Sequence, residues 1–222
     1  MRLEVHPILE DDFPEMVSAQ WTSFESPFSG LIRAAAPIFN NDRVASLATS
    51  VDVQLAQHRT AQPESHWIKV VDTDANGKLV GAAQWFIYER NPFEKAEEFV
   101  ADWWPEVLHI AFTIPEYRRR GVGNMLMEWG TQKADSLSLE CWLDASDYGR
   151  PLYEKHGFIY IMDHFLEPDI DEKGLSDIEK EELKNLRESM LPIHVAAMWR
   201  PKGGRYIEGM TEKPWETDVN EP

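Results

Sequence analysis

Hydrophobic positions recur at helical spacing near the N-terminal end of the sequence. A short alternating stretch at residues 3–5 is followed by apolar residues every three or four positions over residues 13–24. This period predicts an amphipathic helix. Asp11 or Asp12 can cap this helix, and Pro14 suits its first turn. A strand followed by a helix is therefore expected here.

A second amphipathic helix is predicted shortly afterwards. Asn41 or Asp42 can cap it, because short polar side chains accept hydrogen bonds from the first free amides of a helix. Its apolar stripe consists of Val44, Leu47, Ala48, Val51 and Leu55. Two consecutive helices therefore separate the first strand from the rest of the predicted sheet.

The hydrophobic period changes to that of β-strands from residue 66 onward. Residues 66–72 and 78–88 are strand-like, and the Asn76-Gly77 pair in the loop between them is typical of a hairpin turn. Helices are expected after residue 121 and over residues 148–157. Further strands are predicted over residues 107–114, 139–144, 158–167 and 193–200. The order is β-α-α-β-β-β-α-β-α-β-(α)-β, which indicates an α/β fold with a mixed sheet covered by helices on both faces.

The segment before the last strand is dense in charge. Residues 167–189 contain nine acidic and four basic residues, and Ser176 and Glu179 have the spacing of a helix capping box. We expect a single domain over residues 1–200, in which residues 167–190 form an acidic helical excursion. Residues 201–222 are read as a polar, irregular C-terminal tail.

Length and composition limit the classes of protein to which the chain can belong. A chain of 222 residues is long enough for one sizeable core, and the lone Cys141 excludes an intramolecular disulfide. Residues 1–20 lack the pattern of a secretory signal, and no apolar run approaches the roughly 18 residues needed to span a bilayer. A soluble cytoplasmic protein with no membrane partner is therefore expected, either as a monomer or as a homodimer.

The charge disfavours one class of partner. The formal net charge is −17, with 39 acidic against 22 basic residues. Most of such a surface repels a phosphate backbone, so a nucleic-acid partner is not expected. A cationic amine would be tolerated or weakly attracted, although acidity can equally serve solubility alone.

Three arginines precede two glycines at the mouth of the helix predicted after residue 121. The sequence Arg118-Arg119-Arg120-Gly121-Val122-Gly123 follows a strand and opens a helix, where free backbone N–H groups and the helix dipole favour an anion. Glycine lets the backbone approach a ligand closely. The pattern lacks the Gly-Lys-Ser/Thr of a P-loop and the third glycine of the dinucleotide-binding fingerprint.

These residues resemble the GNAT superfamily of N-acetyltransferases. Arg118-x-x-Gly121-x-Gly123 is similar to the Arg/Gln-x-x-Gly-x-Gly/Ala signature of that superfamily, and residues 145–158 resemble its second block, Leu-Tyr-x-Lys-x-Gly-Phe. The resemblance implies a GNAT-like fold whose central sheet splays between the fourth and fifth strands. The acidic segment at residues 167–190 departs from the compact pattern of the family.

The resemblance also implies acetyl-CoA as the cofactor. Its pyrophosphate is expected on the turn, and its pantetheine arm on the edge of the strand before it. Asp144, at the end of its strand, could contact the pantetheine arm or the substrate amine, or could equally cap a helix. The implied cofactor-binding residues are Ala111, Phe112, Thr113, Arg118, Arg119, Arg120, Gly121, Val122, Gly123, Asn124, Asp144, Ser146 and Tyr153.

Two residues are candidates for proton transfer. Tyr153 occupies the general-acid position of the family, where a phenol can protonate the departing thiolate, or it can merely orient the thioester. His109 alternates onto the less apolar face of its strand and matches a histidine of the arylalkylamine branch, so it is the candidate base. A structural histidine, with a water chain as the base, is the alternative. Cys141 is read as a buried thiol, and no cluster of residues has metal-ligand spacing.

The expected function is acetyl transfer from acetyl-CoA directly to a small-molecule primary amine. Acetylation of a peptide N-terminus or a protein lysine is the first alternative. A non-catalytic sensor of acyl-CoA is the second.

Overall fold

The computed structural model describes residues 1–88, 110–166 and 193–216, together with scattered positions between residues 173 and 188. Two compact units are distinguished within the chain. The first consists of Met1–Leu126 and Leu166–Ile193, and the second of Met127–Phe165 and His194–Pro222. Each is taken in turn.

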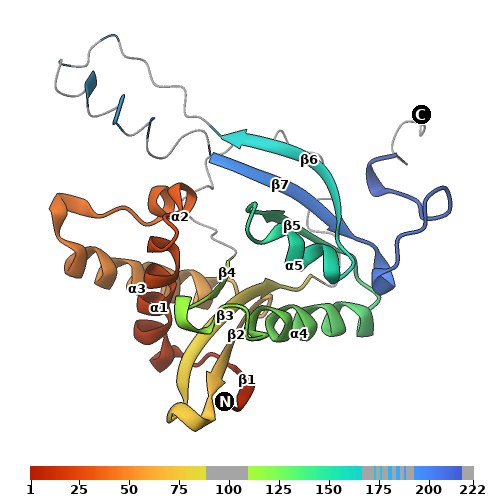
Figure 1. Ribbon diagram of the computed structural model, residues 1–222, viewed down its shortest axis with the longest axis horizontal. Coiled ribbons are helices and arrows are strands. Elements are labelled where there is room, and N and C mark those ends of the chain that lie inside the picture. The colour runs from red at the N-terminus through yellow and green to blue at the C-terminus, as the bar shows by residue number, and fades with distance from the viewer. Residues whose placement is uncertain are drawn as a thin grey trace. The chain divides into compact units, whose positions relative to one another are not determined.

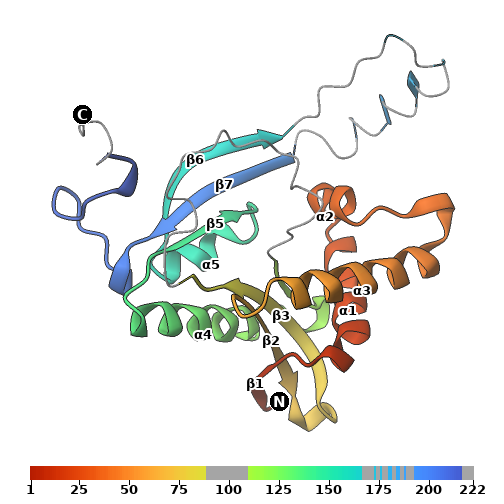
Figure 2. The same ribbon diagram turned by 180° about the vertical axis from the view of Figure 1, so that it is seen from behind.

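Three helices precede the first hairpin: α1 (Phe13–Glu25), α2 (Gly30–Ala35) and α3 (Arg43–Thr60). The first and third were predicted. The six residues of α2 were not, because so short an element shows no hydrophobic period. Figures 1 and 2 show α3 crossing α1, and the two helices are in contact. Among the described helices, none combines the length and the apolar character needed to cross a membrane.

The helices contribute one face of the core of the first unit. Phe13, Met16 and Val17 of α1 are fully buried, and they pack with Trp67 of the sheet. The predicted stripe on α3 lies against this cluster through Leu47, Val51 and Leu55. Val44, in the first turn of that helix, is instead 80% exposed, and Ala48 is exposed too, so neither extends the stripe.

The two predicted helix caps differ in what they bind. The Asp42 carboxylate accepts hydrogen bonds from the amides of Val44 and Ala45, at 3.1 and 3.0 Å, and so caps α3 as predicted. The Asp12 carboxylate makes no cap bond to α1. It accepts from the Leu9 amide at 2.8 Å and pairs with the ammonium of Lys69 at 2.6 Å.

The first unit contains a four-stranded antiparallel sheet in the order β1-β2-β3-β4. Its hairpin turn has Asn76 and Gly77 in left-handed conformation, with φ of 57° and 73°, which the Asn-Gly pair favours. The strands are β1 (Leu3–Pro7), β2 (Ser65–Asp72), β3 (Lys78–Phe86) and β4 (Ala111–Thr113). The predicted hairpin is therefore confirmed.

One glycine of β3 lets two elements approach the sheet. A Cβ atom on Gly81 would lie 2.6 Å from the Phe112 carbonyl oxygen and 2.6 Å from Cγ1 of Val122. Neither distance is possible for real atoms, so the absence of a side chain permits the first turn of α4 (Val122–Ser136) to lie against β3. Val122 is 1% exposed in that position.

The second unit contains a three-stranded sheet in the order β5-β7-β6, with β5 antiparallel to β7. Its elements are β5 (Cys141–Ala145), α5 (Arg150–Lys155), β6 (Ile159–Leu166) and β7 (Ile193–Arg200). Consecutive strands β4 and β5 are thus edge strands of two different sheets. This break is the one predicted between the fourth and fifth strands, and the mixed α/β fold class is confirmed.

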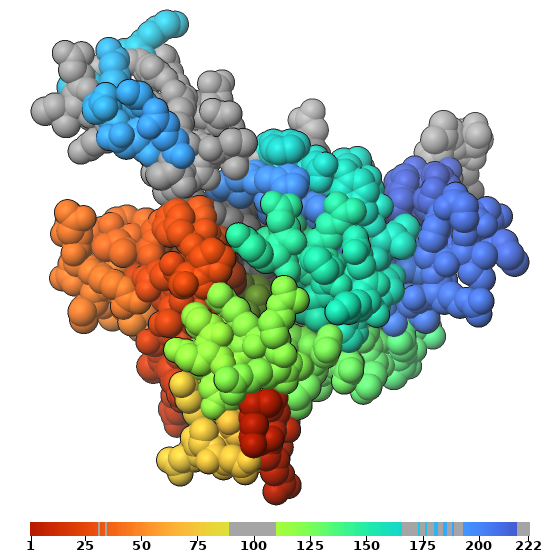
Figure 3. All heavy atoms as spheres, viewed as in Figure 1, coloured from red at the N-terminus to blue at the C-terminus, as the bar shows by residue number. Residues whose placement is uncertain are grey.

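Residues 201–216 have no strand and only short 3-10 turns, at Lys202–Gly204 and Pro214–Glu216. They still pack on the second unit. The Trp215 ring lies 5.9 Å from that of Trp142 and 5.3 Å from that of Trp199, measured between centroids. Figure 3 shows this C-terminal segment, in dark blue, next to the blue-green residues of the same unit.

The C-terminal segment is also anchored through an ion pair. The Arg200 guanidinium binds both carboxylate oxygens of Asp135, at 2.7 and 2.8 Å, and donates to the His156 carbonyl at 2.8 Å. A Cβ atom on Gly204 would meet this guanidinium at 2.2 Å. The ion pair, 5% exposed at Arg200, therefore lies directly beneath the backbone of the segment. The acidic excursion predicted at residues 167–190 falls mostly outside the described residues.

Candidate active site

The glycine turn between β4 and α4 has the features of an anion site. Gly121 has φ of +90°, a conformation that side chains disfavour, and no atom lies within 4 Å of the position where its Cβ would be. The first bond of the helix runs from the Met125 amide to the Gly121 carbonyl, at 3.1 Å. The amides of Val122 and Gly123 precede this bond, in the first turn of the helix, and stand at the positive end of its dipole.

The three predicted arginines of the turn differ in what they contact. The Arg118 guanidinium donates to the carbonyls of Thr113 and Ser23, at 3.3 and 2.6 Å, and to that of Ser26. It therefore ties the turn to the C-terminal end of α1. The sequence predicted a role toward a phosphate and missed this one, because the carbonyl partners on α1 are more than 90 residues away.

Arg119 and Arg120 are both exposed. Arg119 has φ of +60°, and Arg120 lies over the ring of Tyr117 at 5.3 Å. The Tyr117 hydroxyl donates to the buried carboxylate of Asp72 at 2.9 Å, which fixes the ring on which Arg120 lies. Two exposed cations thus lie on the same turn as the amides of the helix start.

The remaining residues predicted on the turn lie at the start of α4. The side chain of Val122 is buried against the sheet, Gly123 is half-buried, and Asn124 is exposed. Val122 can therefore contribute only its backbone to a ligand at this surface.

Strand β4 offers a backbone edge. The Ile110 carbonyl and the Ile114 amide bond to β3, at 2.9 and 3.0 Å, so the alternation of an antiparallel ladder turns the backbone groups of Ala111 and Thr113 toward the other edge. No other described strand of this sheet lies on that side. The Phe112 side chain is 5% exposed and belongs to the core.

Tyr153 lies in α5 of the second unit, where its ring is half-buried. It meets the Phe158 ring edge to face, with centroids 5.9 Å apart at 62°. No described residue forms a hydrogen bond with its hydroxyl. Burial raises the pKa of this phenol, so it remains protonated throughout the neutral range.

Two other predicted residues lie close to Tyr153 in the sequence. Asp144 is on β5, and burial raises the pKa of its carboxyl while the charge of His164 opposes the shift. The Ser146 hydroxyl accepts a hydrogen bond from the Gly149 amide at 3.3 Å, in the turn that leads into α5. The structure thus describes the predicted residues in two groups, residues 111–124 in the first unit and residues 144–153 in the second.

His109, the predicted base, lies outside the described residues. The thiol of Cys141 is buried, and burial raises its pKa to about 11. It is therefore protonated near neutrality and is not an activated nucleophile.

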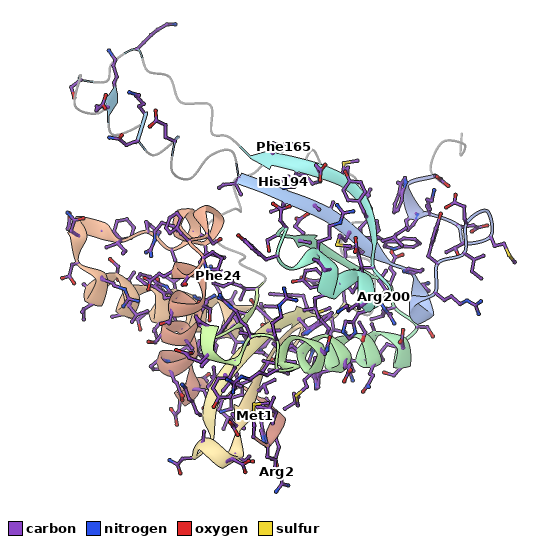
Figure 4. All side chains as sticks on the ribbon, in the orientation of Figure 1. Met1, Arg2, Phe24, Phe165, His194 and Arg200 are labelled. Atoms are coloured by element: carbon purple, nitrogen blue, oxygen red, sulfur yellow. The ribbon has the colours of Figure 1, made fainter. Side chains whose placement is uncertain are left out.

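The sequence did not predict a cluster of side chains around one histidine, His194, on the sheet of the second unit. His194 of β7 contacts Asp163 of β6 through Nε2 at 3.0 Å and Asp147 through Nδ1 at 3.1 Å. Its ring stacks on Phe165 with centroids 4.8 Å apart, and Figure 4 labels these two residues on neighbouring strands. The hydrogen bond to Asp163 is the main cause that raises the pKa of His194. Only the alternation of β6 and β7 in the sequence hints at this grouping.

Comparison with known proteins relates these features to a family. The sequence model of the acetyltransferase (GNAT) family matches residues 18–158, a range that contains the glycine turn and Tyr153. No curated protein matches the chain in sequence.

Solved structures show the same fold at low sequence identity. A histone acetyltransferase HPA2 and related acetyltransferase from Corynebacterium glutamicum has a TM-score of 0.55 at 20% identity, covering 91% of this chain and 97% of its own. The PaiA N-acetyltransferase from Thermoplasma acidophilum, in complex with coenzyme A, has a TM-score of 0.51 at 12% identity, covering 90% and 99%. The ribosomal-protein-S18-alanine N-acetyltransferase from Escherichia coli has a TM-score of 0.51 at 13% identity, covering 95% and 100%.

Proposed function

Because the chain belongs to the acetyltransferase (GNAT) family, we propose that it transfers the acetyl group of acetyl-CoA directly to a small-molecule primary amine. The observation that carries this proposal is that the match to the family covers both the glycine turn and the helix bearing Tyr153. The turn and the helix supply the two things that such a reaction needs from the chain, an anion site and a proton donor.

The glycine turn fits the pyrophosphate of the cofactor. The amides of Val122 and Gly123 at the helix start, the open position at Gly121 and the exposed Arg119 and Arg120 can together hold a dianion. The backbone groups of Ala111 and the Thr113 amide, on the edge of β4 away from β3, suit the amide groups of a pantetheine arm, whereas the Thr113 carbonyl already accepts from Arg118. When bound, acetyl-CoA supplies a thioester whose acyl carbon is attacked by the amine.

Tyr153 is proposed as the general acid. As the new C–N bond forms and the C–S bond breaks, the departing sulfur gains negative charge, and a protonated phenol can neutralise it. An ordinary phenol has a pKa of about 10 and an ordinary thiol about 8.5. The phenol therefore transfers its proton only as charge develops on the sulfur, and until then it serves as a hydrogen-bond donor.

A panel of acceptors tests the proposal, with release of free CoA as the readout. The panel contains small primary amines, among them aromatic and polycationic ones, and peptides with a free N-terminus or a lysine. We expect turnover with a small amine, and Tyr153→Phe should lower it by about 10²–10⁴-fold. The substitution removes only the hydroxyl, so the ring contact with Phe158 and the binding of acetyl-CoA should persist.

Three results would count against parts of this proposal. Rates on peptides far above those on every small amine would favour the peptide or lysine acetyltransferase. Binding of acetyl-CoA without turnover on any acceptor would favour a sensor. Weakened binding with normal turnover in Tyr153→Phe would make the tyrosine an orienting residue rather than an acid.

His109 is proposed to take the proton of the attacking amine, directly or through one water. The proposal rests on the alternation of its strand in the sequence. In the same assay His109→Gln should remove an acidic limb near pH 6.5 from the pH–rate profile, since glutamine takes up no proton there. A variant with the wild-type profile would show that the proton leaves by another route.

A further inference from the structure

We propose that Gly149 is a positioning residue, which sets the place of the Tyr153 phenol because it has no side chain. Gly149 stands immediately before α5, four residues from the tyrosine. The inference rests on the proposed function of Tyr153 and gives a role to a residue to which the sequence analysis assigned none.

The contact between the two residues leaves no room for a methyl group. A Cβ atom at Gly149 would lie 2.9 Å from Cε2 and 3.5 Å from Cζ of Tyr153. The backbone of Gly149 has φ of −82° and ψ of −33°, which any residue adopts. The glycine is therefore required by the tyrosine ring and not by the conformation of the chain.

The ring cannot retreat freely from an added methyl group. The ring also meets Phe158, which is 3% exposed, edge to face. The Phe158 amide also donates to the Tyr153 carbonyl at 3.2 Å. Phe158 thus contacts both the ring and the backbone of Tyr153. A methyl group that presses on Cε2 therefore displaces the hydroxyl end of the tyrosine ring.

The turn that carries Gly149 is itself fixed. The Ser146 carbonyl accepts hydrogen bonds from the amides of Gly149 and Arg150, both at 2.9 Å. The Arg150 guanidinium binds Glu154 at 2.9 Å and lies over the Tyr160 ring at 4.5 Å, which joins the start of α5 to β6. An added methyl group is therefore accommodated by the ring rather than by the turn.

The expected consequence is a misplaced proton donor on a folded protein. The distance must grow from 2.9 Å to an ordinary contact of at least 3.4 Å, a shift of several tenths of an ångström. Since a misplacement of about 1 Å can lower a rate by about 10²-fold, Gly149→Ala should lower kcat roughly 10-fold. The KM for acetyl-CoA and the melting temperature should change little.

A double-mutant cycle tests the inference with Gly149→Ala, Tyr153→Phe and the double variant. If Gly149 acts through the hydroxyl, the alanine lowers kcat in the wild-type background and has little further effect in the phenylalanine background. A second readout needs no activity. The ring signal of Tyr153 in a spectrum of ¹³C-labelled tyrosine, assigned by its loss in Tyr153→Phe, should shift in Gly149→Ala because the ring moves relative to Phe158.

The outcomes separate this inference from the proposed function. Equal fractional losses of kcat in both backgrounds, or an unmoved ring signal in Gly149→Ala, would overturn the positioning role. A normal kcat in Tyr153→Phe would instead overturn the general acid, and a shifted ring signal would still support the steric role of Gly149. Tyr148→Ala, which truncates the neighbouring side chain that is 81% exposed, controls for a general disturbance of the turn and should leave the ring signal in place.

Discussion

A glycine is favoured at three positions near the candidate site, for a different physical reason at each. Gly81 admits the buried Val122, Gly121 adopts a φ of +90° in open space, and Gly149 makes room for an aromatic ring. The sequence predicted only Gly121, from its place in a motif. Gly81 depends on atoms of neighbouring elements, and Gly149 depends on where a ring four residues later lies, and neither is recorded in the pattern of residue types.

The open position at Gly121 allows its backbone and charge effects to be separated. Acetyl-CoA at a hundredfold excess over its Kd should stabilise the wild-type fold by about 2.7 kcal/mol. Gly121→Asn and Gly121→Asp place side chains of equal size on the same unfavourable φ, but only aspartate repels a pyrophosphate. We expect a reduced thermal shift for asparagine and none for aspartate.

A matched control for this pair exists in the first hairpin. Gly77 has φ of +73° and likewise nothing within 4 Å of its Cβ position. Gly77→Asp should therefore lower the melting temperature for the same backbone reason and still show the full shift with acetyl-CoA. A normal shift in Gly121→Asp would place the cofactor elsewhere.

At the scale of elements, the sequence predicted most of the fold because the relevant signals are local. The alternation of apolar and polar residues and the Asn76-Gly77 turn predicted β2 and β3, and apolar residues at helical spacing predicted α1 and α3. The short α2 carries no such period and was missed. Contacts between elements were also beyond prediction, such as the bonds from Arg118 to carbonyls at the end of α1.

The His194 cluster joins β6, β7 and the turn before α5 in the second unit, and it gives that junction a pH dependence. An imidazolium can donate to both Asp147 and Asp163, whereas a neutral imidazole has a single N–H. Tyr160 also hydrogen-bonds to Asp163 and Arg150 adds its charge nearby. Because the folded pKa of His194 is raised, its contribution to stability is complete below about pH 6.5 and is lost as the pH rises through the folded pKa.

Asp163→Asn tests this junction. The variant should lower the pKa of His194, measured by titration of its ring protons in NMR. The urea midpoint should fall below that of the wild type near pH 6, and the difference should shrink toward pH 9. Asp52→Asn, which removes the same charge from an exposed position of α3, should change neither quantity. An unchanged pKa of His194 in Asp163→Asn would remove the carboxylate as the cause.

At the scale of the whole chain, the family and the fold class were predictable from two motifs and the order of elements. The placement of residues 201–216 was not. Their anchors are Arg200 bound to Asp135 and Trp215 packed on Trp199, and these contacts join residues that the sequence separates widely. A polar, irregular stretch carries no hydrophobic period, so the sequence indicated a tail.

The packing of Trp215 has an optical consequence. Three indoles, those of Trp142, Trp199 and Trp215, lie within 5.3–6.2 Å of one another, and Glu140 accepts hydrogen bonds from the indole N–H groups of the first two. Transition dipoles this close couple, so the trio should give an exciton couplet in circular dichroism. Trp142 and Trp199 belong to the sheet and couple without the third indole, so the part of the couplet that is lost in Trp215→Phe reports the docking of the segment without any added label.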